Sequence, residues 1–262
     1  MARPATGNRF FQVFRKIPEF ELRPGPTVTF ISEVDLSEVE EIRKEAKAQK
    51  PSYTAFAIKA LALSLREYPY ANQRIARTVW LPFARARLQR FERCDIAVAA
   101  ERDVPGVESA AFVDIIRAAD EKSLFEITTW LIELAQSDTE TNQQWREFSQ
   151  IIDRCPTWLA LFLIRLPYLA PSLWVRYRGA AALVTSPAKY GVDAVVACWS
   201  WPIGVSFGLV RDRAVVRDGA VKPCPTFNLV CNFDRRIMAG AQAGRFFASI
   251  VRNLESARTT LA

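Results

Sequence analysis

The side chains best suited to chemistry lie in the C-terminal third of the chain, where Asp234, Arg235 and Arg236 follow an apolar run. A guanidinium group donates hydrogen bonds and carries a positive charge, but it stays protonated at physiological pH and cannot accept a proton. Arg235 is therefore a candidate for clamping an oxyanion or a phosphate, and general-base catalysis by it is excluded. For Asp234 and Arg236 we expect a structural ion pair.

The chain of 262 residues contains no histidine, which removes the commonest general base near neutral pH. The cysteines are an odd number without a CxxC pair, so no metal site is expected. Cys198 and Cys231 flank the C-terminal region, and we expect inert buried thiols there; a role as covalent acyl carriers is the minor alternative. Free thiols indicate a reducing, cytoplasmic location. The cysteines are Cys94, Cys155, Cys198, Cys224 and Cys231.

Apolar periodicity predicts the elements that position these side chains. We expect helices from about residue 38 to before Pro51, at 52–68, at 122–136 and at 241–254. Strands are expected at 28–34, 94–100, 181–184, 192–196, 205–210, 214–216 and 227–231, with a turn at Asp218 and Gly219. The pattern predicts a mixed sheet with flanking helices, without an internal repeat or a visible domain boundary.

Residues 158–174 read WLALFLIRLPYLAPSLW and are strongly apolar, but Arg165, Pro167 and Pro171 interrupt them. Because proline breaks helices, a simple membrane span is excluded. A buried hairpin packed within the oligomer is expected, with a lid or a membrane-surface element as alternatives. Since the chain has no run of about 18 apolar residues and no apolar leader at its start, membrane contact is not expected.

The net charge of +7 includes a basic stretch interleaved with Trp80, Phe83 and Phe91. Such a face attracts phosphates, including those of coenzyme A, but no nucleic-acid motif accompanies it, so nucleic-acid binding is not expected. The arginines of this stretch are Arg74, Arg77, Arg85, Arg87, Arg90 and Arg93.

The run NFDRRIMAGAQAGRF at residues 232–246 resembles a family signature, F-D-H-R-x-x-D-G-A-x-A-A-R-F. This signature belongs to the catalytic core of the dihydrolipoyl acyltransferases of 2-oxo acid dehydrogenase complexes, and chloramphenicol acetyltransferase shares part of it. Further segments resemble the family in the same order, which is more specific than one short motif. They are FISEVD at 30–35, PSYTAFAIKA at 51–60, YPYAN at 68–72, DIAVA at 95–99 and IRAADEKSLFEI at 116–127.

The resemblance implies an α/β (α+β) chloramphenicol acetyltransferase-like fold in which residues 1–262 form a single catalytic-core domain. An apolar insertion at about 157–175 is atypical of the family, and no lipoyl domain or subunit-binding domain is expected. Because the family builds each active site between two subunits, the resemblance also implies a homotrimer, and larger shells remain open. Coenzyme A or acyl-CoA is the implied co-substrate, although the residues that would bind it are not identified.

In the family, a histidine in this motif takes the proton from the acceptor, and an acidic residue or asparagine four positions later steadies the site. A serine or threonine of the neighbouring subunit stabilises the tetrahedral oxyanion. Here Arg235 and Ala239 occupy the histidine and acidic positions, and Thr185, or next Ser186, matches the hydroxyl position. The alternative for that pair, capping a strand end, is equally weighted. Loss of a general base costs roughly 10²–10⁴ in rate, so the reaction has changed or been given up.

Two functions therefore remain open. The first is a stand-alone acyltransferase that carries an acyl group from coenzyme A to a small-molecule acceptor, or performs related thioester chemistry, without a histidine base. The alternative is a catalytically silent scaffold or partner subunit of the same fold, in contact with another protein through residues 158–174.

Overall fold

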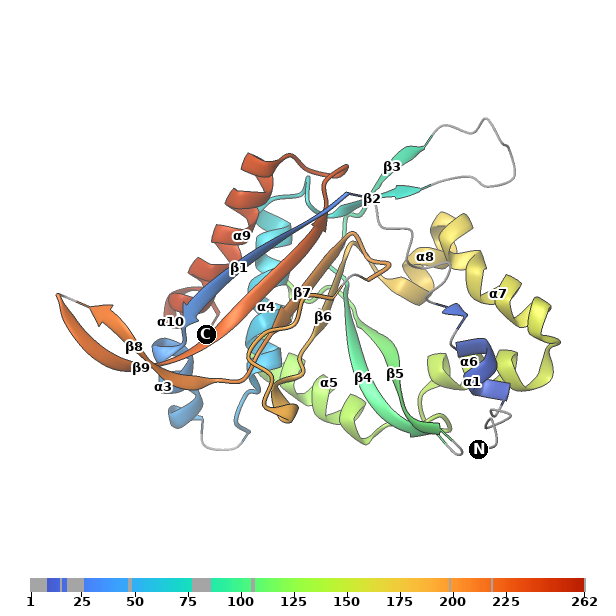
Figure 1. The fold of residues 1–262 in the computed structure, drawn as a ribbon, viewed down its shortest axis with the longest axis horizontal. Coiled ribbons are helices and arrows are strands. Elements are labelled where there is room, and N and C mark those ends of the chain that lie inside the picture. Colours follow the sequence, from blue (N-terminus) through green and yellow to red (C-terminus); the bar gives the residue numbers. More distant parts are fainter. Residues whose placement is uncertain are drawn as a thin grey trace, which may run out of the picture.

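The computed structural model describes residues 9–14, 16–17, 26–46, 49–76, 86–104, 107–197, 199–217 and 219–261 (Figure 1). The helices are α1 (Arg9–Phe14), α3 (Ser37–Glu45), α4 (Tyr53–Glu67), α5 (Leu124–Gln136), α6 (Gln143–Arg154), α7 (Thr157–Leu169), α8 (Pro171–Arg178), α9 (Gly240–Glu255) and α10 (Ala257–Thr260). The strands are β1 (Thr27–Asp35), β2 (Gln73–Ala76), β3 (Arg87–Arg90), β4 (Ile96–Val104), β5 (Val107–Ile116), β6 (Ala182–Thr185), β7 (Ile203–Phe207), β8 (Arg211–Arg217) and β9 (Ala220–Asp234).

A mixed sheet runs through the centre of the described structure. Seven strands form it, in the order β1-β9-β7-β6-β4-β5, with β8 paired to β9. Strand β6 is parallel to both β4 and β7, whereas the other pairs are antiparallel. A separate two-stranded ribbon consists of β2 and β3. The predicted α/β mixed sheet with flanking helices is therefore confirmed.

The larger core lies between one face of the sheet and α4 and α9, which lie side by side along it (Figure 1). Side chains alternate along a strand, so every second residue of β9 faces these helices. Phe227, Leu229, Cys231 and Phe233 are all buried in this core, together with Phe246 of α9. This burial fixes where β9 ends and α9 begins.

Local signals explain why the helices form where they do. Ser52 begins α4 by accepting a hydrogen bond from the backbone of Ala55 at 3.2 Å. At the start of α5, Ser123 and Glu126 form a reciprocal capping box. Asn142 caps α6 by accepting from the backbone N–H of Trp145 at 3.1 Å. Each cap satisfies amides that a helix start leaves without partners.

The opposite face of the sheet carries a smaller aromatic core. Trp174 of α8 and Trp201 pack with Leu183 of β6 and Ala97 of β4. The indole nitrogen of Trp174 donates to the carbonyl of Ala180 at 3.0 Å, so the tryptophan is satisfied although it is buried. This packing holds α8 against the sheet.

Residues 192–196 are not a strand, contrary to our expectation. The segment crosses the same face as the aromatic core. The backbone of Leu209 donates to the carbonyl of Val192 at 2.9 Å, whereas side chains of the sheet donate to carbonyls further along the segment. Ser206 donates to Val195 at 2.7 Å, and Asn232 donates to Ala197 at 3.0 Å. These bonds satisfy the backbone without a strand ladder, which explains why alternation alone gave the wrong prediction.

Residues 158–174 fold as two helices, α7 and α8. Pro167 lies inside α7, and Pro171 opens α8, where a missing amide costs nothing. Among the described residues, no single helix is long and apolar enough to cross a membrane. By length and composition alone, α7 and α8 meet that criterion as a pair bent by 103°.

Candidate functional site

Residues 235–239 connect β9 to α9 and are called the motif turn here, because they carry Arg235, Arg236 and Ala239 of the signature. Arg236 donates from Nε to both carboxylate oxygens of Asp234, at 2.9 and 3.0 Å, and its backbone N–H also donates to that carboxylate at 2.9 Å. The hydrogen bond to Asp234 raises the pKa of Arg236 above its ordinary value. The expected ion pair between these two side chains is thus confirmed, and it fixes the shape of the turn.

Arg235 lies between the members of this ion pair and is exposed. Its backbone N–H donates to the carbonyl of Pro26 at 2.8 Å, so the main chain at this position is anchored while the side chain faces away from the core. A cation held on a fixed backbone is suited to binding an anion. Within one copy of the chain, the Arg235 side chain lies at the surface and not in a dry channel.

Ala239, at the family's acidic position, is the residue that precedes α9 and is exposed. Its methyl group supplies neither a hydrogen-bond acceptor nor a charge. The side chain of Gln242 accepts from the backbone N–H of Ala239 at 2.9 Å. The helix start is therefore stabilised without an acidic residue at Ala239.

Strand β2 and the residues just before it hold the motif turn in place through side-chain hydrogen bonds. Gln73 donates from Nε2 to the carbonyl of Ile237 at 2.8 Å, and the Tyr70 hydroxyl donates to the carbonyl of Gln242 at 3.0 Å. Asn72 and Gln73 are buried, and in each the amide oxygen has no hydrogen-bond partner. The position of Asn72 was visible in the sequence, whereas the contact of Gln73 with the turn spans 164 residues and could not be read from it.

Arg74 corrects the expectation of a continuous basic face. It is buried, donates to Gln89 at 2.7 Å, and its guanidinium lies 4.1 Å from the centre of the Trp174 ring. Burial lowers the pKa of Arg74 to about 10. Of the other arginines, Arg87, Arg90 and Arg93 are exposed, whereas Arg77 and Arg85, with Trp80 and Phe83, lie outside the described residues.

Thr185 and Ser186 follow one another at the end of β6 but differ in their surroundings. The Ser186 hydroxyl donates to the carbonyl of Phe207 at 2.8 Å and accepts from the backbone of Ala188 at 3.3 Å. These bonds agree with the alternative role of Ser186, which is to cap the end of a strand. Thr185 is half-buried and shares the sheet face of Leu183, away from α4 and α9.

The register separates Thr185 from Arg235. Thr185 lies opposite Ser206 of β7, which lies opposite Val230 of β9, and Arg235 follows Val230 by five residues. With a rise of about 3.3 Å per residue and about 4.8 Å between strands, the two backbones are roughly 15–20 Å apart. One copy of the chain therefore does not bring the two predicted site residues together.

The cysteines do not form a reactive site in the described structure. Cys231 is buried, and burial raises the pKa of its thiol to about 12. Such a thiol is protonated and a poor nucleophile at neutral pH, as expected. Cys198 lies outside the described residues. Within the described part of the chain, no group of three or more His, Cys, Asp and Glu side chains could hold a metal ion.

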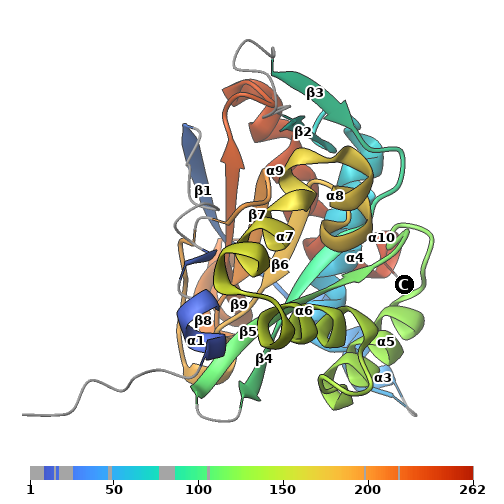
Figure 2. The same ribbon diagram turned by 90° about the vertical axis from the view of Figure 1, so that its right-hand side faces the viewer.

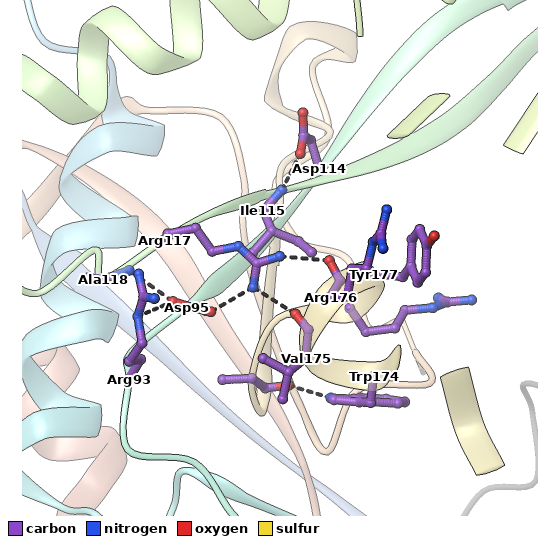
Figure 3. A network of polar contacts seen from close by, with 12 residues as sticks. Arg93, Asp95, Asp114, Ile115, Arg117, Ala118, Trp174, Val175, Arg176 and Tyr177 are labelled. Atoms are coloured by element: carbon purple, nitrogen blue, oxygen red, sulfur yellow. Dashed lines mark hydrogen bonds and ion pairs between the residues drawn. The ribbon is translucent and has the colours of Figure 1, made fainter. Parts of the chain in front are cut away.

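Two further motif residues form a buried network that the sequence did not reveal (Figure 3). The carboxylate of Asp95, which is 2% exposed, accepts from Arg117 at 2.7 Å and from the backbone of Ala118 at 2.9 Å. Arg117 also donates to the carbonyls of Val175 and Arg176, at 2.7 and 2.6 Å. The network ties α8 to the start of β4 and the end of β5.

Known structures share this architecture. The cubic core of the pyruvate dehydrogenase multienzyme complex matches with a TM-score of 0.72 and 21% identity, covering 100% of this chain and 95% of that one. A probable dihydrolipoamide acetyltransferase from Listeria monocytogenes gives 0.69 and 20%, covering 100% and 99%. Chloramphenicol acetyltransferase gives 0.53 and 13%, covering 93% and 94%. The fold is therefore chloramphenicol acetyltransferase-like.

Sequence comparison defines the family. The model of the 2-oxoacid dehydrogenases acyltransferase catalytic domain matches residues 21–150. The dihydrolipoyllysine-residue acetyltransferase component of the Bacillus subtilis pyruvate dehydrogenase complex is 25% identical over 250 residues, covering 90% of this chain and 46% of that protein. The chain belongs to this family of acyltransferase catalytic domains, and it spans about half the length of the curated relatives it matches. The family model ends before the turn that carries Arg235.

Proposed function

We propose that the chain transfers an acyl group from coenzyme A to a small-molecule acceptor, or performs related thioester chemistry, without a histidine base. The observation that carries this proposal is the motif turn. Arg236 binds the carboxylate of Asp234 from the turn itself, while Arg235 extends from an anchored backbone as an exposed cation. An ordered turn with a positive charge at the position of the family's base supports the proposal.

In this mechanism Arg235 binds the anionic form of the acceptor and directs it at the thioester carbonyl. Enols, phenols and thiols with a low pKa lose their proton to solvent before they bind, so no protein base is needed. The acceptor anion adds to the carbonyl carbon, and coenzyme A leaves as its thiolate. The hydroxyl of Thr185 would donate to the oxyanion of the tetrahedral intermediate.

We further propose that the working unit is a homotrimer, because Thr185 and Arg235 lie too far apart to share one site within one copy. The outer face of β1 and the segment 192–197, which crosses the neighbouring strands β7 and β9, support this assignment. Ile31 and Val196 are each 57% exposed there, on the side of the sheet away from α4 and α9. A second copy seated on this face would cover apolar surface and complete the site.

Calorimetric titration with acetyl-CoA and with free coenzyme A tests the proposal without knowledge of the acceptor. Saturable binding in the micromolar range is expected. No binding at millimolar ligand would exclude the transferase function.

For turnover, we expect Arg235→Ala to lower acetyl transfer to an acidic thiol such as thiophenol by roughly 10²-fold, because a donor that binds the thiolate is lost. Arg146→Ala, which removes another exposed arginine on α6, is the matched control and should leave the rate unchanged. Equal rates for both variants would rule out a role for Arg235.

The alternative is a catalytically silent scaffold or partner subunit. Ala239 and Arg235 leave the turn without a proton acceptor, and Ser186 uses its hydroxyl within the strand end. A scaffold would form the oligomer without binding coenzyme A. The titration therefore separates the two functions, with sedimentation velocity as the second measurement.

A further inference from the structure

The outward face of α7 is apolar except at Arg165, which lies on it between Phe162 and Leu169. Ala160, Ile164 and Pro167 are buried and mark the inward side, at the spacing of one helical face. On the opposite side, Trp158 is 71% exposed and Phe162 is 41% exposed. By the same spacing, half-buried Leu169 continues this outward face to the end of the helix. A helix of a globular protein normally turns polar residues outward, so the exposed apolar residues of this face indicate an interaction surface.

The sequence from Arg154 to Val192 carries only cationic charges, and it is bounded by Asp153 and Asp193. Between Arg154 and Val192 the chain has no Asp or Glu, and its cations are Arg154, Arg165, Arg176, Arg178 and Lys189. Arg154 and Arg165 are exposed. Arg176 and Lys189 contact the acidic side chains Glu147 and Glu101, and Arg178 lies 4.9 Å from the rings of both Tyr168 and Trp201. An acid-free segment of this length favours an anionic surface as the occupant of the apolar face.

The face sits on a rigid support. Helix α8 is tied to the sheet through Arg117 and Trp174, and α7 packs against both α8 and α6. Helix α7 lies at the right-hand edge of the molecule in Figure 1 and toward the viewer in Figure 2, on the side remote from the β8–β9 hairpin. The helix is thus presented at the periphery, where a flat surface can reach it.

We propose that the outward face of α7 docks on the surface of an anionic lipid bilayer. The helix lies in the plane of the interface, with Trp158 and Phe162 at the boundary between headgroups and acyl chains. Arg154 and Arg165 bind lipid phosphates. This inference does not depend on the acyl-transfer proposal, and it reverses the expectation from sequence that the chain makes no membrane contact.

Co-sedimentation of the full chain with vesicles tests this inference. We expect binding to vesicles of phosphatidylcholine with phosphatidylglycerol, and much weaker binding to phosphatidylcholine alone. Trp158→Glu combined with Phe162→Glu should weaken partitioning at least roughly ten-fold, and Arg165→Gln about five-fold on anionic vesicles only. Phe125→Glu, at a side chain 61% exposed on α5, is the matched control and should bind as the unaltered chain does.

Two results would overturn the proposal. The first is equal partitioning of the double variant and the Phe125→Glu control, with both folded by circular dichroism. The second is absence of vesicle binding together with a smaller sedimentation coefficient for the double variant, which would assign the face to a second copy of the chain. A depth measurement adds a readout that is specific to the bilayer: brominated lipids should quench Trp158, and Trp158→Phe should remove that quenching while binding persists.

Discussion

At the scale of single residues, the turn after β9 differs from the family signature at two positions, Arg235 and Ala239, and hydrogen bonds from Gln73 and Arg236 hold it in place. If the turn keeps the geometry of a family site, restoring the two side chains should restore base catalysis. We expect Arg235→His with Ala239→Asp to raise acetyl transfer to dihydrolipoamide by roughly 10²-fold or more at neutral pH. Arg235→His alone should gain less, since the orienting partner is missing. Unchanged rates would mean that more than the base has been lost.

At the scale of elements, the Asp95–Arg117 network determines how firmly α8 is held. Replacing Arg117 by Met leaves the buried Asp95 carboxylate with only the Ala118 N–H and the longer ion pair to Arg93, at 3.6 Å, and it removes donors from two carbonyls. We therefore expect a loss of about 1–3 kcal/mol of unfolding free energy in urea titrations. Trypsin should then cleave faster after Arg176. Arg66→Met is the control, because the Arg66–Asp120 pair is long, at 3.9 Å, and its arginine is exposed; its effect should stay within about 0.5 kcal/mol. A similar loss for both variants would refute this account.

The elements also show which parts of the fold and of the candidate site could be predicted from the sequence. Strand β1 and helices α4, α5 and α9 were predicted because each combines clear periodicity with a recognisable start. Helix α6 was not predicted from the sequence. In QQWREFSQIIDR only Trp145 and Ile152 are buried, and because most other residues are polar, the apolar periodicity is weak. The positions of Arg235 and Thr185 were visible in the sequence. The burial of Arg74 and the contacts of Gln73 and Arg117 could not be predicted from the sequence, because they depend on packing between distant segments.

At the scale of the whole molecule, no helix of the described part of the chain covers the outer face of β1 (Figure 1). If a second copy covers it, placing a charge there should disrupt the oligomer. Ile31→Glu is expected to shift the sedimentation coefficient toward that of a single chain, because an unpaired carboxylate is costly to bury. Phe125→Glu should sediment as the unaltered protein does. An oligomer that survives Ile31→Glu would place the interface elsewhere.

The aromatic core beneath α8 has a practical consequence. Among tryptophans in the described part of the chain, Trp145, Trp174 and Trp201 are at most 5% exposed, whereas Trp158 is 71% exposed. Emission from the first group should be blue-shifted and inaccessible to iodide, while Trp158 should emit to the red and be readily quenched. Trp130 and Trp199 are half-buried, so the difference in iodide quenching between the unaltered chain and Trp158→Phe isolates the signal of Trp158 and reports on α7 without a label.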